Sequence, residues 1–224
     1  MLECRPVIPK HPSPPQSWRT MLVTPVVLLA GCASLLTPNT PGALLFQDDF
    51  SNAGSGWDRY ADPTYTSEYI DGTYQIAIQS AQTQAWSNPS LELDNVRMEV
   101  DAATVAGPLD NAFGMICRYQ DPDNYYFFLI SGDGYAGIGL AKDGRRVMLT
   151  GDAMLPADPI LQGYRTNHLR ADCDGFHLTF YVNGVLVGEA RAAEWPSGDI
   201  GLLAATYGEP GIDIRFDNIT LLRP

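Results

Sequence analysis

Apolar and polar residues alternate with a period of two along most of the chain beyond its first 43 residues. This spacing is typical of β-strands that bury one face. It places Tyr74, Ile76 and Ile78 on one side of a strand, and it recurs in residues 96–102 and 176–184. No window of ordinary helix length keeps the helical period of about 3.6 residues. The pattern therefore predicts an all-β domain.

Turn residues separate these predicted strands at short intervals. Asn183-Gly184 and Asp143-Gly144 are dipeptides that favour the two-residue turns of β-hairpins. About a dozen short strands with regular turns are typical of a two-sheet antiparallel sandwich or jelly roll. Residues 44–224 are predicted to form one such domain, and we expect neither a second domain nor an internal repeat.

The first 31 residues have the pattern of an export signal. A basic, proline-rich stretch precedes an apolar run that begins at Met21 and is too short to span a bilayer, which takes about 20 residues. The run ends in Leu29-Ala30-Gly31-Cys32, which resembles the lipobox of bacterial lipoproteins. The resemblance implies cleavage before Cys32 and attachment of lipid to that residue. The alternative is an ordinary secretory signal with a chance cysteine.

The chain therefore divides into three predicted parts: a lipoprotein signal peptide (residues 1–31), a flexible tether (32–43) and a β domain (44–224). Lipid on Cys32 would hold the domain at a bilayer, because more than one acyl chain gives stable attachment. We expect an extracytoplasmic lipoprotein, at the cell surface or in the periplasm.

The chain is acidic. It has 14 Lys and Arg residues against 26 Asp and Glu residues, which gives a formal net charge of −12. Cleavage of the predicted signal would remove three basic residues and one acidic residue and leave −14. Such a chain lacks the basic surface that binds phosphate backbones, so no nucleic acid partner is expected. Three histidines and scattered cysteines also do not build a Cys/His zinc module.

Two cysteines of the β domain fall on inward faces of their strands. Cys117 shares a face with Phe113 and Met115, and Cys173 shares one with Leu169 and Ala171. Disulfides form in the oxidising compartments that exported proteins reach. We therefore expect a Cys117–Cys173 disulfide, with two separate buried thiols as the alternative.

Several segments together carry a family resemblance. They are Asp48–Ser51, Gly56-Trp57, Arg118–Tyr135, Leu178–Gly184, Gly198–Leu202 and Phe216–Ile219. These segments are similar to the concanavalin A-like lectin and glucanase superfamily of laminin G-like jelly rolls. The nearest subgroup is bacterial domains related to the 3-keto-disaccharide hydrolase family. The resemblance covers about residues 45–224 and implies a jelly roll, a fold that hosts lectins, enzymes and adhesion modules alike.

The first and last strands resemble the edge pair that brings the termini together in this fold. Such pairing would bring Asp48 and Asp49 near Asp217, where calcium could use their oxygens as ligands. The same carboxylates also fit solvated turn and edge positions, so calcium is the only cofactor considered and none is certain.

The sequence assigns no catalytic residue. Glucanases of the superfamily carry a Glu-x-Asp-x-(x)-Glu pattern, and the best match, Glu99-Val-Asp101, lacks the second glutamate. The only histidines beyond the predicted signal, His168 and His177, have no Gly-x-Ser-x-Gly turn to accompany them. An enzyme is therefore less favoured than a binding protein.

Aromatic residues outside the core parity are the candidate ligand-binding residues. Sugars bind to flat aromatic rings together with hydrogen-bonding groups, and both suit a concave sheet. Alternation turns Tyr125 and Phe127 away from the core, and Arg118 is expected on that same outer face. Trp57, Tyr69 and Trp86 lie near predicted strand ends. The alternative is that these rings close the ends of the sandwich.

These observations favour a lipid-anchored, lectin-like domain that binds glycan or another cell-envelope component without catalysis. One alternative is a glycoside hydrolase of the 3-keto-disaccharide hydrolase type. The other is a structural protein-interaction module of the envelope. The partners expected are thus a glycan or envelope component and, through Cys32, the lipid bilayer.

Overall fold

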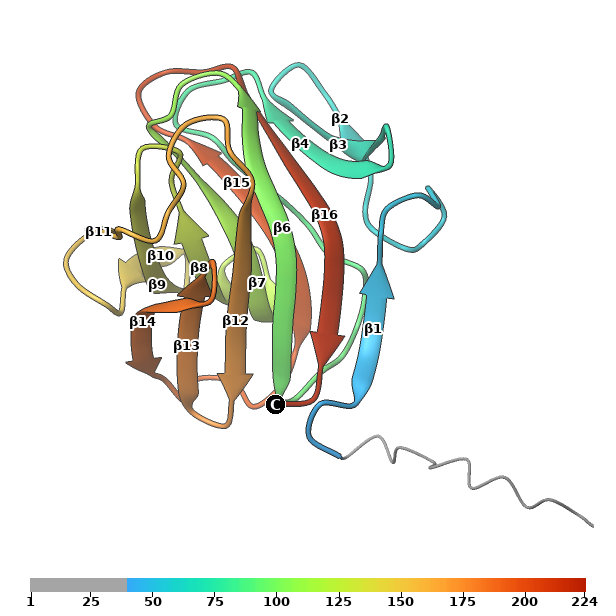
Figure 1. Ribbon diagram of the computed structural model, residues 1–224, viewed down its shortest axis with the longest axis vertical. Helices are drawn as coiled ribbons and strands as arrows, with labels where there is room; N and C mark the ends of the chain where they lie inside the picture. Colours follow the sequence, from blue (N-terminus) through green and yellow to red (C-terminus); the bar gives the residue numbers. More distant parts are fainter. Residues whose placement is uncertain (1–39) are drawn as a thin grey trace, which may run out of the picture. The chain divides into compact units, whose positions relative to one another are not determined.

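The computed structural model describes residues 40–224, and every helix or strand that it assigns in this range is a β-strand (Figure 1). The predicted signal peptide, Cys32 and most of the predicted tether lie outside the described residues. None of residues 40–224 forms a helix of the length and hydropathy that a membrane crossing requires.

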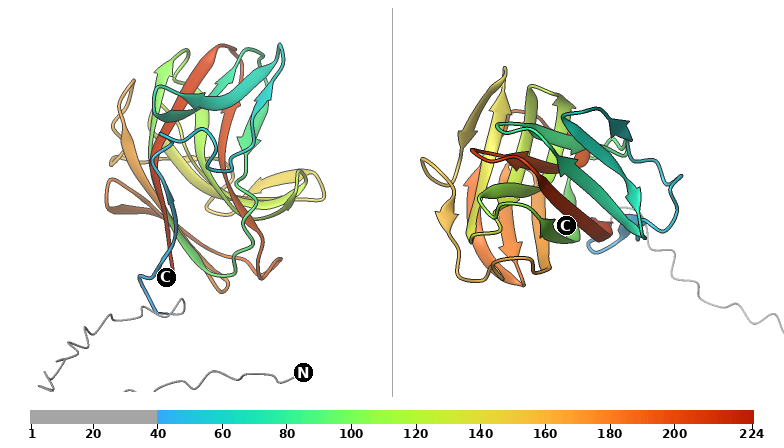
Figure 2. Two further views of the ribbon diagram at one scale, coloured as in Figure 1. Left: turned by 90° about the vertical axis from the view of Figure 1, so that its right-hand side faces the viewer. Right: turned by 90° about the horizontal axis from the view of Figure 1, so that it is seen from above.

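Two antiparallel sheets stack face to face and form a sandwich (Figures 1 and 2). The larger, sheet A, faces the viewer in Figure 1. Its order is β14 (Val185–Arg191), β13 (His177–Val182), β12 (Asn167–Asp174), β6 (Val96–Ala106), β16 (Ile212–Leu222), β4 (Thr73–Ile78), β3 (Tyr65–Ile70) and β2 (Tyr60–Ala61), with β1 (Leu44–Asp48) also paired to β16.

Sheet B lies behind sheet A in Figure 1. Its order is β10 (Arg145–Met148), β9 (Tyr135–Lys142), β8 (Asn124–Ile130), β7 (Asn111–Asp121), β15 (Asp199–Thr206) and β5 (Gln84–Ser87), with β11 (Leu155–Pro156) also paired to β9. The two-sheet antiparallel jelly-roll sandwich expected from the sequence is confirmed.

The core lies between the sheets and consists of the residues that alternation predicted. Tyr74, Ile76 and Ile78 of β4 are fully buried there, as are Phe128 and Ile130 of β8. Burial of each such side chain stabilises the fold by about 1.5–3 kcal/mol.

The hairpin turns also match the sequence. Asn183 and Gly184 have φ of 51° and 81°, and Asp143 and Gly144 have φ of 51° and 75°. Both residues of such a turn need positive φ, which Asn, Asp and Gly tolerate best. The dipeptides connect β13 to β14 and β9 to β10, as expected.

The first and last strands pair, but not at an edge. β1 pairs with the second half of β16, from Asp48 opposite Ile219 to Leu44 opposite Leu222. β4 pairs with the first half of β16, and β6 pairs with it on its other side. β16 is therefore an interior strand, which corrects the expectation of an edge pair.

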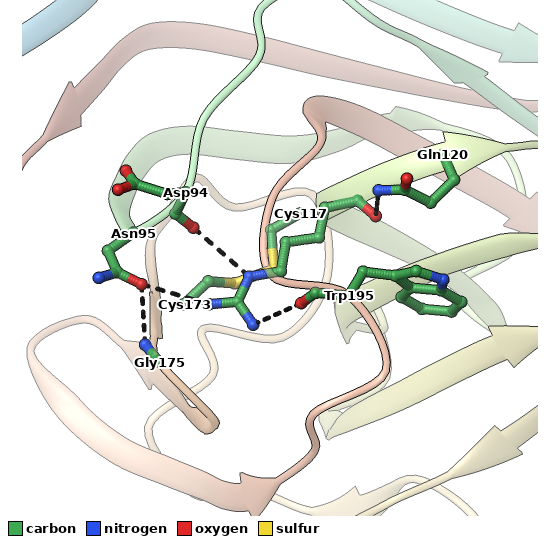
Figure 3. The surroundings of a disulfide bond; sticks show 8 residues. Asp94, Asn95, Cys117, Gln120, Cys173, Gly175 and Trp195 are labelled. Carbon is green, nitrogen blue, oxygen red and sulfur yellow. Dashed lines mark hydrogen bonds between the residues drawn. A yellow bond between two sulfur atoms is a disulfide. The ribbon is translucent and has the colours of Figure 1, made fainter.

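The expected disulfide joins the two sheets. Cys117 of β7 and Cys173 of β12 are bonded, and both are fully buried (Figure 3). The cysteines therefore point inward as their parity predicted, and the alternative of two separate thiols is wrong.

Arg118 departs from the sequence prediction. The pairing of β7 with β8 shifts between Cys117 and Asp121, and Arg118 has φ of 51°. A bulge of this kind redirects the side chains that follow it. Arg118, which directly follows the disulfide-bonded Cys117, is consequently only 2% exposed instead of lying open on the outer face of the sheet.

The Arg118 guanidinium holds loops together at this end of the sandwich. It donates hydrogen bonds to the carbonyl oxygen of Trp195 (3.0 Å), the carbonyl oxygen of Asp94 (3.4 Å) and Oδ1 of Asn95 (3.4 Å). Asn95 Oδ1 also accepts a bond from the amide of Gly175 (2.8 Å; Figure 3). Burial lowers the pKa of Arg118 from its usual value. These contacts make Arg118 a structural residue.

Candidate ligand-binding groove

The outer face of sheet B is apolar, although a sheet face turned to solvent is usually polar. A second hydrophobic cluster covers it, separate from the core. Its buried members are Ala112, Ile116, Tyr125, Phe127, Leu129, Ala141 and Leu203. The residues packed against them are Trp86, Tyr119, Met148, Met154 and Ala205. The buried members are at most 7% exposed, so side chains of the domain itself cover most of this face.

Glycines of β9 shape this face. Phe127 of β8 lies opposite Gly139, and Leu129 lies opposite Gly137. A Cβ atom on Gly139 would lie 2.1 Å from Cζ of Phe127, and one on Gly137 would lie 2.2 Å from Cε of Met148. The glycines thus leave the space in which the Phe127 ring and the Met148 side chain lie over β9.

We expect Gly139→Ala to displace the Phe127 ring and to lower the free energy of unfolding by about 1–3 kcal/mol, because overpacking forces side chains out of position. Urea unfolding measures the change. Gly208→Ala is the matched control, since a Cβ there meets nothing within 4 Å. Equal stability of the two variants would contradict this account of the face.

A groove of about 710 Å³ lies over one end of the cluster. Its floor consists of Ala112, Leu129, Leu203 and Ala205. Its apolar walls are Phe127, Met148, Ala153 and Met154. The methionines flank the segment between β10 and β11, which follows the yellow β9–β10 hairpin that projects from the sandwich in Figure 2.

One end of the groove carries two carboxylates and two tyrosines. Asp110 precedes β7, Asp133 follows β8, Tyr135 begins β9 and Tyr207 follows β15. Tyr135 and Tyr207 are 41% and 43% exposed, so their rings are open to a ligand. The carboxylate of Asp133 accepts a hydrogen bond from the hydroxyl of Ser131.

Besides burial, the charges of both carboxylates affect the pKa of Tyr207. Its partial burial, with the charges of Asp110 and Asp133 adding to the effect, raises the pKa of Tyr207 above the usual value. Its hydroxyl donates a weak hydrogen bond to Sδ of Met154 (3.8 Å). A tyrosine hydroxyl is protonated at neutral pH even with its usual pKa, so Tyr207 has a proton that it can donate.

Arg146 and Gln84 line the groove on β10 and β5, and Tyr125 connects them. The Tyr125 hydroxyl accepts hydrogen bonds from Nε2 of Gln84 (2.9 Å) and Nε of Arg146 (3.1 Å). The guanidinium of Arg146 also lies over the Tyr125 ring, 5.9 Å from its centroid. These bonds hold Arg146 and Gln84 in place, although the two residues come from opposite edges of sheet B.

Three of the six candidate binding residues come together on this face. The Tyr125 ring lies 6.2 Å from that of Phe127 and 6.4 Å from that of Trp86. Nε1 of Trp86 donates to the hydroxyl of Tyr119 (3.3 Å). Of the three, Phe127 lines the groove, while Tyr125 and Trp86 lie beside it.

The other three candidates lie elsewhere. Trp57 is 4% exposed in the core, 5.6 Å from the ring of Phe50. Its amide donates to the hydroxyl of Tyr69 (3.0 Å), and Tyr69 packs against the same core. Their rings close an end of the sandwich, which was the alternative considered for them. Arg118 is held beside the disulfide.

The three carboxylates considered for calcium each accept a hydrogen bond from a nearby backbone amide. Asp48 accepts bonds from the Phe50 amide (2.8 Å) and the Ser55 hydroxyl, and Asp49 accepts one from the Ser51 amide (3.0 Å). Partial burial raises the pKa of Asp217, and the charges of Asp101 and Asp49 add to the rise. Within residues 40–224, no group of three or more acidic, His or Cys side chains is placed to hold a metal ion.

The incomplete glucanase pattern lies on sheet A, away from the groove. Asp101 of β6 accepts hydrogen bonds from Nδ1 of His168 (2.9 Å) and Nδ2 of Asn218 (3.2 Å). Glu99 lies 3.9 Å from Nε2 of His168. Glu99, Asp101 and His168 therefore interact with one another on an exposed face of the sheet.

Most groove residues were not predicted. Asp110, Asp133, Tyr135, Arg146 and Tyr207 come from turns and strand ends that meet only through strand pairing. The sequence did offer one indication of them. Strand β8 carries aromatic residues on both faces, so the turn that follows it must lie at one end of the outer aromatic face.

No family model matches the chain, and no curated protein matches it by sequence. Among solved structures, the carbohydrate-binding module CBM66 from Bacillus subtilis matches with a TM-score of 0.58 and 19% identity, covering 75% of this chain and 96% of its own. A Bacillus licheniformis β-glucanase matches with a TM-score of 0.57 and 12% identity, covering 83% and 100%.

A third solved structure is the GH43 protein BlXynB from Bacillus licheniformis, with a TM-score of 0.58 and 13% identity. The match covers 80% of this chain and 39% of that one, so this chain corresponds to less than half of BlXynB. Identities this low show a shared fold and leave the activity open. The sandwich and these matches together show that the chain has the concanavalin A-like jelly-roll fold.

Proposed function

We propose that the domain binds a glycan in the groove on sheet B without cleaving it, and that lipid on Cys32 holds it at the cell envelope. The observation that carries the proposal is the pair of exposed tyrosines, Tyr135 and Tyr207, at the rim of an apolar groove that also carries carboxylates. Aromatic rings take the apolar faces of sugars, and carboxylates accept bonds from hydroxyls.

The size of the groove supports this proposal. Its volume of about 710 Å³ falls within the range of about 300–1,000 Å³ that is typical of small-molecule sites. The solved structures of similar fold include a carbohydrate-binding module and glycoside hydrolases, which is consistent with a sugar ligand.

Glycoside hydrolysis is the second candidate, and the Asp110 and Asp133 pair favours it. Hydrolases flank the scissile bond with two carboxyl groups, about 5–10 Å apart. Here the β7–β8 register, with Phe113 opposite Ile130, places both aspartates at the same end of the groove. That placement favours holding one end of a ligand over cleaving a bond at the middle of the groove.

A glycan array probed with the purified chain tests the proposal, followed by titration of the best ligand. We expect binding that Tyr135→Ala with Tyr207→Ala weakens about tenfold or more, since tenfold corresponds to about 1.4 kcal/mol of lost contact. Tyr60→Ala is the matched control, because Tyr60 is 45% exposed on β2 of sheet A. The control variant should bind as the unsubstituted chain does.

Two results would contradict the proposal. Absence of binding to every glycan would reject a sugar ligand altogether. Release of reducing ends from the bound glycan, abolished by Asp110→Asn or Asp133→Asn, would replace binding by hydrolysis.

A further inference from the structure

The floor of the groove is aliphatic at the end that carries the carboxylates. Ala112 and Ala205 are register partners in neighbouring strands, and Gln84 lies opposite Ala205 on the next strand. Ala112 is fully buried, whereas Ala205 is partly exposed, and its single methyl group leaves a shallow hollow in the groove beside the larger Leu129 side chain.

A sugar hydroxyl placed in this hollow would lose its water without gaining a hydrogen bond from alanine or leucine side chains. Burying a hydroxyl unpaired is costly, whereas burying a methyl group is favourable. The part of the ligand that covers Ala205 is therefore apolar and small.

The groups next to the hollow accept hydrogen bonds. Asp110 directly precedes β7 and Ala112 lies near its start, while Asp133 lies two residues beyond Ser131, in the turn after β8. Two carboxylates at this end disfavour sugars that carry carboxylate or sulfate groups and favour an N–H or O–H donor. Arg146, the cation that lines the groove, is bonded to Tyr125.

We propose that the groove selects glycans whose sugar units carry an acetamido group. The acetyl methyl lies on Ala205, and the amide N–H donates to Asp110 or Asp133. An acetamido group is the common sugar substituent that offers a methyl group and a donor together, as this end of the groove requires. This inference rests on the proposed function and adds the class of sugar.

Titration with three matched trisaccharides tests the selection: tri-N-acetylchitotriose, cellotriose and the glucosamine trimer. They share a β-1,4-linked backbone and differ in carrying an acetamido group, a hydroxyl or an amine at one carbon. We expect tri-N-acetylchitotriose to bind about 10-fold or more tightly than cellotriose, the range that one small apolar group gives in a fitted pocket.

Two variants test whether the floor of the groove causes the preference for acetamido groups. Ala205→Val fills the hollow and is expected to weaken binding of tri-N-acetylchitotriose about 10-fold while changing cellotriose binding less than about twofold. Ala205 is partly exposed, so the added methyl groups have room. Ala61→Val, at an exposed position of β2, is the matched control and should change neither affinity. Circular dichroism confirms that each variant is folded.

Equal affinity for tri-N-acetylchitotriose and cellotriose would overturn the inference while leaving glycan binding intact. Tightest binding of the glucosamine trimer would also overturn it, since attraction of a cation to Asp110 and Asp133 would then explain selection. An array on which only glycans without acetamido groups bind would reject the inference alone. An array without any binding would reject both the inference and the proposed function.

Discussion

Replacing both disulfide cysteines, with Cys117→Ala and Cys173→Ala, is expected to lower the free energy of unfolding by about 4 kcal/mol. The bond connects β7 of sheet B to β12 of sheet A across a separation of 56 residues. A cross-link of that span removes much of the conformational entropy of the unfolded chain. Urea unfolding followed by tryptophan fluorescence measures the loss.

The single variants provide the internal control. Cys117→Ala alone should destabilise the domain nearly as much as the double variant, because either change breaks the bond and the two effects are not additive. Reduction of the unsubstituted chain should give a loss of similar size. A difference below about 1 kcal/mol between oxidised and reduced chain would show that packing between the sheets, and not the cross-link, sets the stability.

Arg118→Met is expected to lower the free energy of unfolding by about 3 kcal/mol. The substitution leaves the oxygens of Asp94, Asn95 and Trp195 without a charged donor at a part-buried place. Hydrogen bonds to charged groups contribute about 1.5–3 kcal/mol each, and buried acceptors are costly to leave unpaired. Arg145→Met, at an exposed position of β10, should change stability by less than about 0.5 kcal/mol.

Arg118→Lys separates charge from geometry. Lysine keeps the positive charge but lacks the planar fork that reaches three acceptors. We expect Arg118→Lys to lower the free energy of unfolding by less than Arg118→Met does. If Arg118→Met were as stable as Arg145→Met, the hydrogen bonds at this end of the sandwich would contribute little, and Arg118 would be free for another role.

The sheets and the core were predictable because the side-chain period of a strand is local. Tyr125 and Phe127 were expected on the face opposite Tyr126 and Phe128, and the structure places them there. The disulfide followed from the same parity at Cys117 and Cys173. In each case, the alternation runs from the start of the strand to the residue without a bulge.

Arg118 was placed on the wrong face because one bulge ends the parity. The bulge lies between Cys117 and Asp121, and Arg118 itself adopts φ of 51°. Positive φ is usually marked by glycine or asparagine, and arginine gives no such mark. Tertiary hydrogen bonds to distant loops stabilise this backbone, and a local pattern does not contain them.

The groove was only half predictable for a related reason. Its floor follows from alternation along β7, β8 and β15, whereas Asp110, Asp133 and Tyr207 meet because β7 begins where β8 and β15 end. Strand neighbours in space are fixed by sheet order, which the sequence did not supply. Loop aromatics such as Trp57 and Tyr69 instead pack into the core, where their burial stabilises the fold.

The place of β16 determines when the domain can fold. β16 contains residues 212–222, yet it pairs with β1, β4 and β6 at the middle of sheet A. During synthesis these earlier strands have no central partner until residues 212–222 have emerged. Contacts of such long sequence separation form late and slowly. Sheet A can therefore complete its strand order only after β16 has been synthesised.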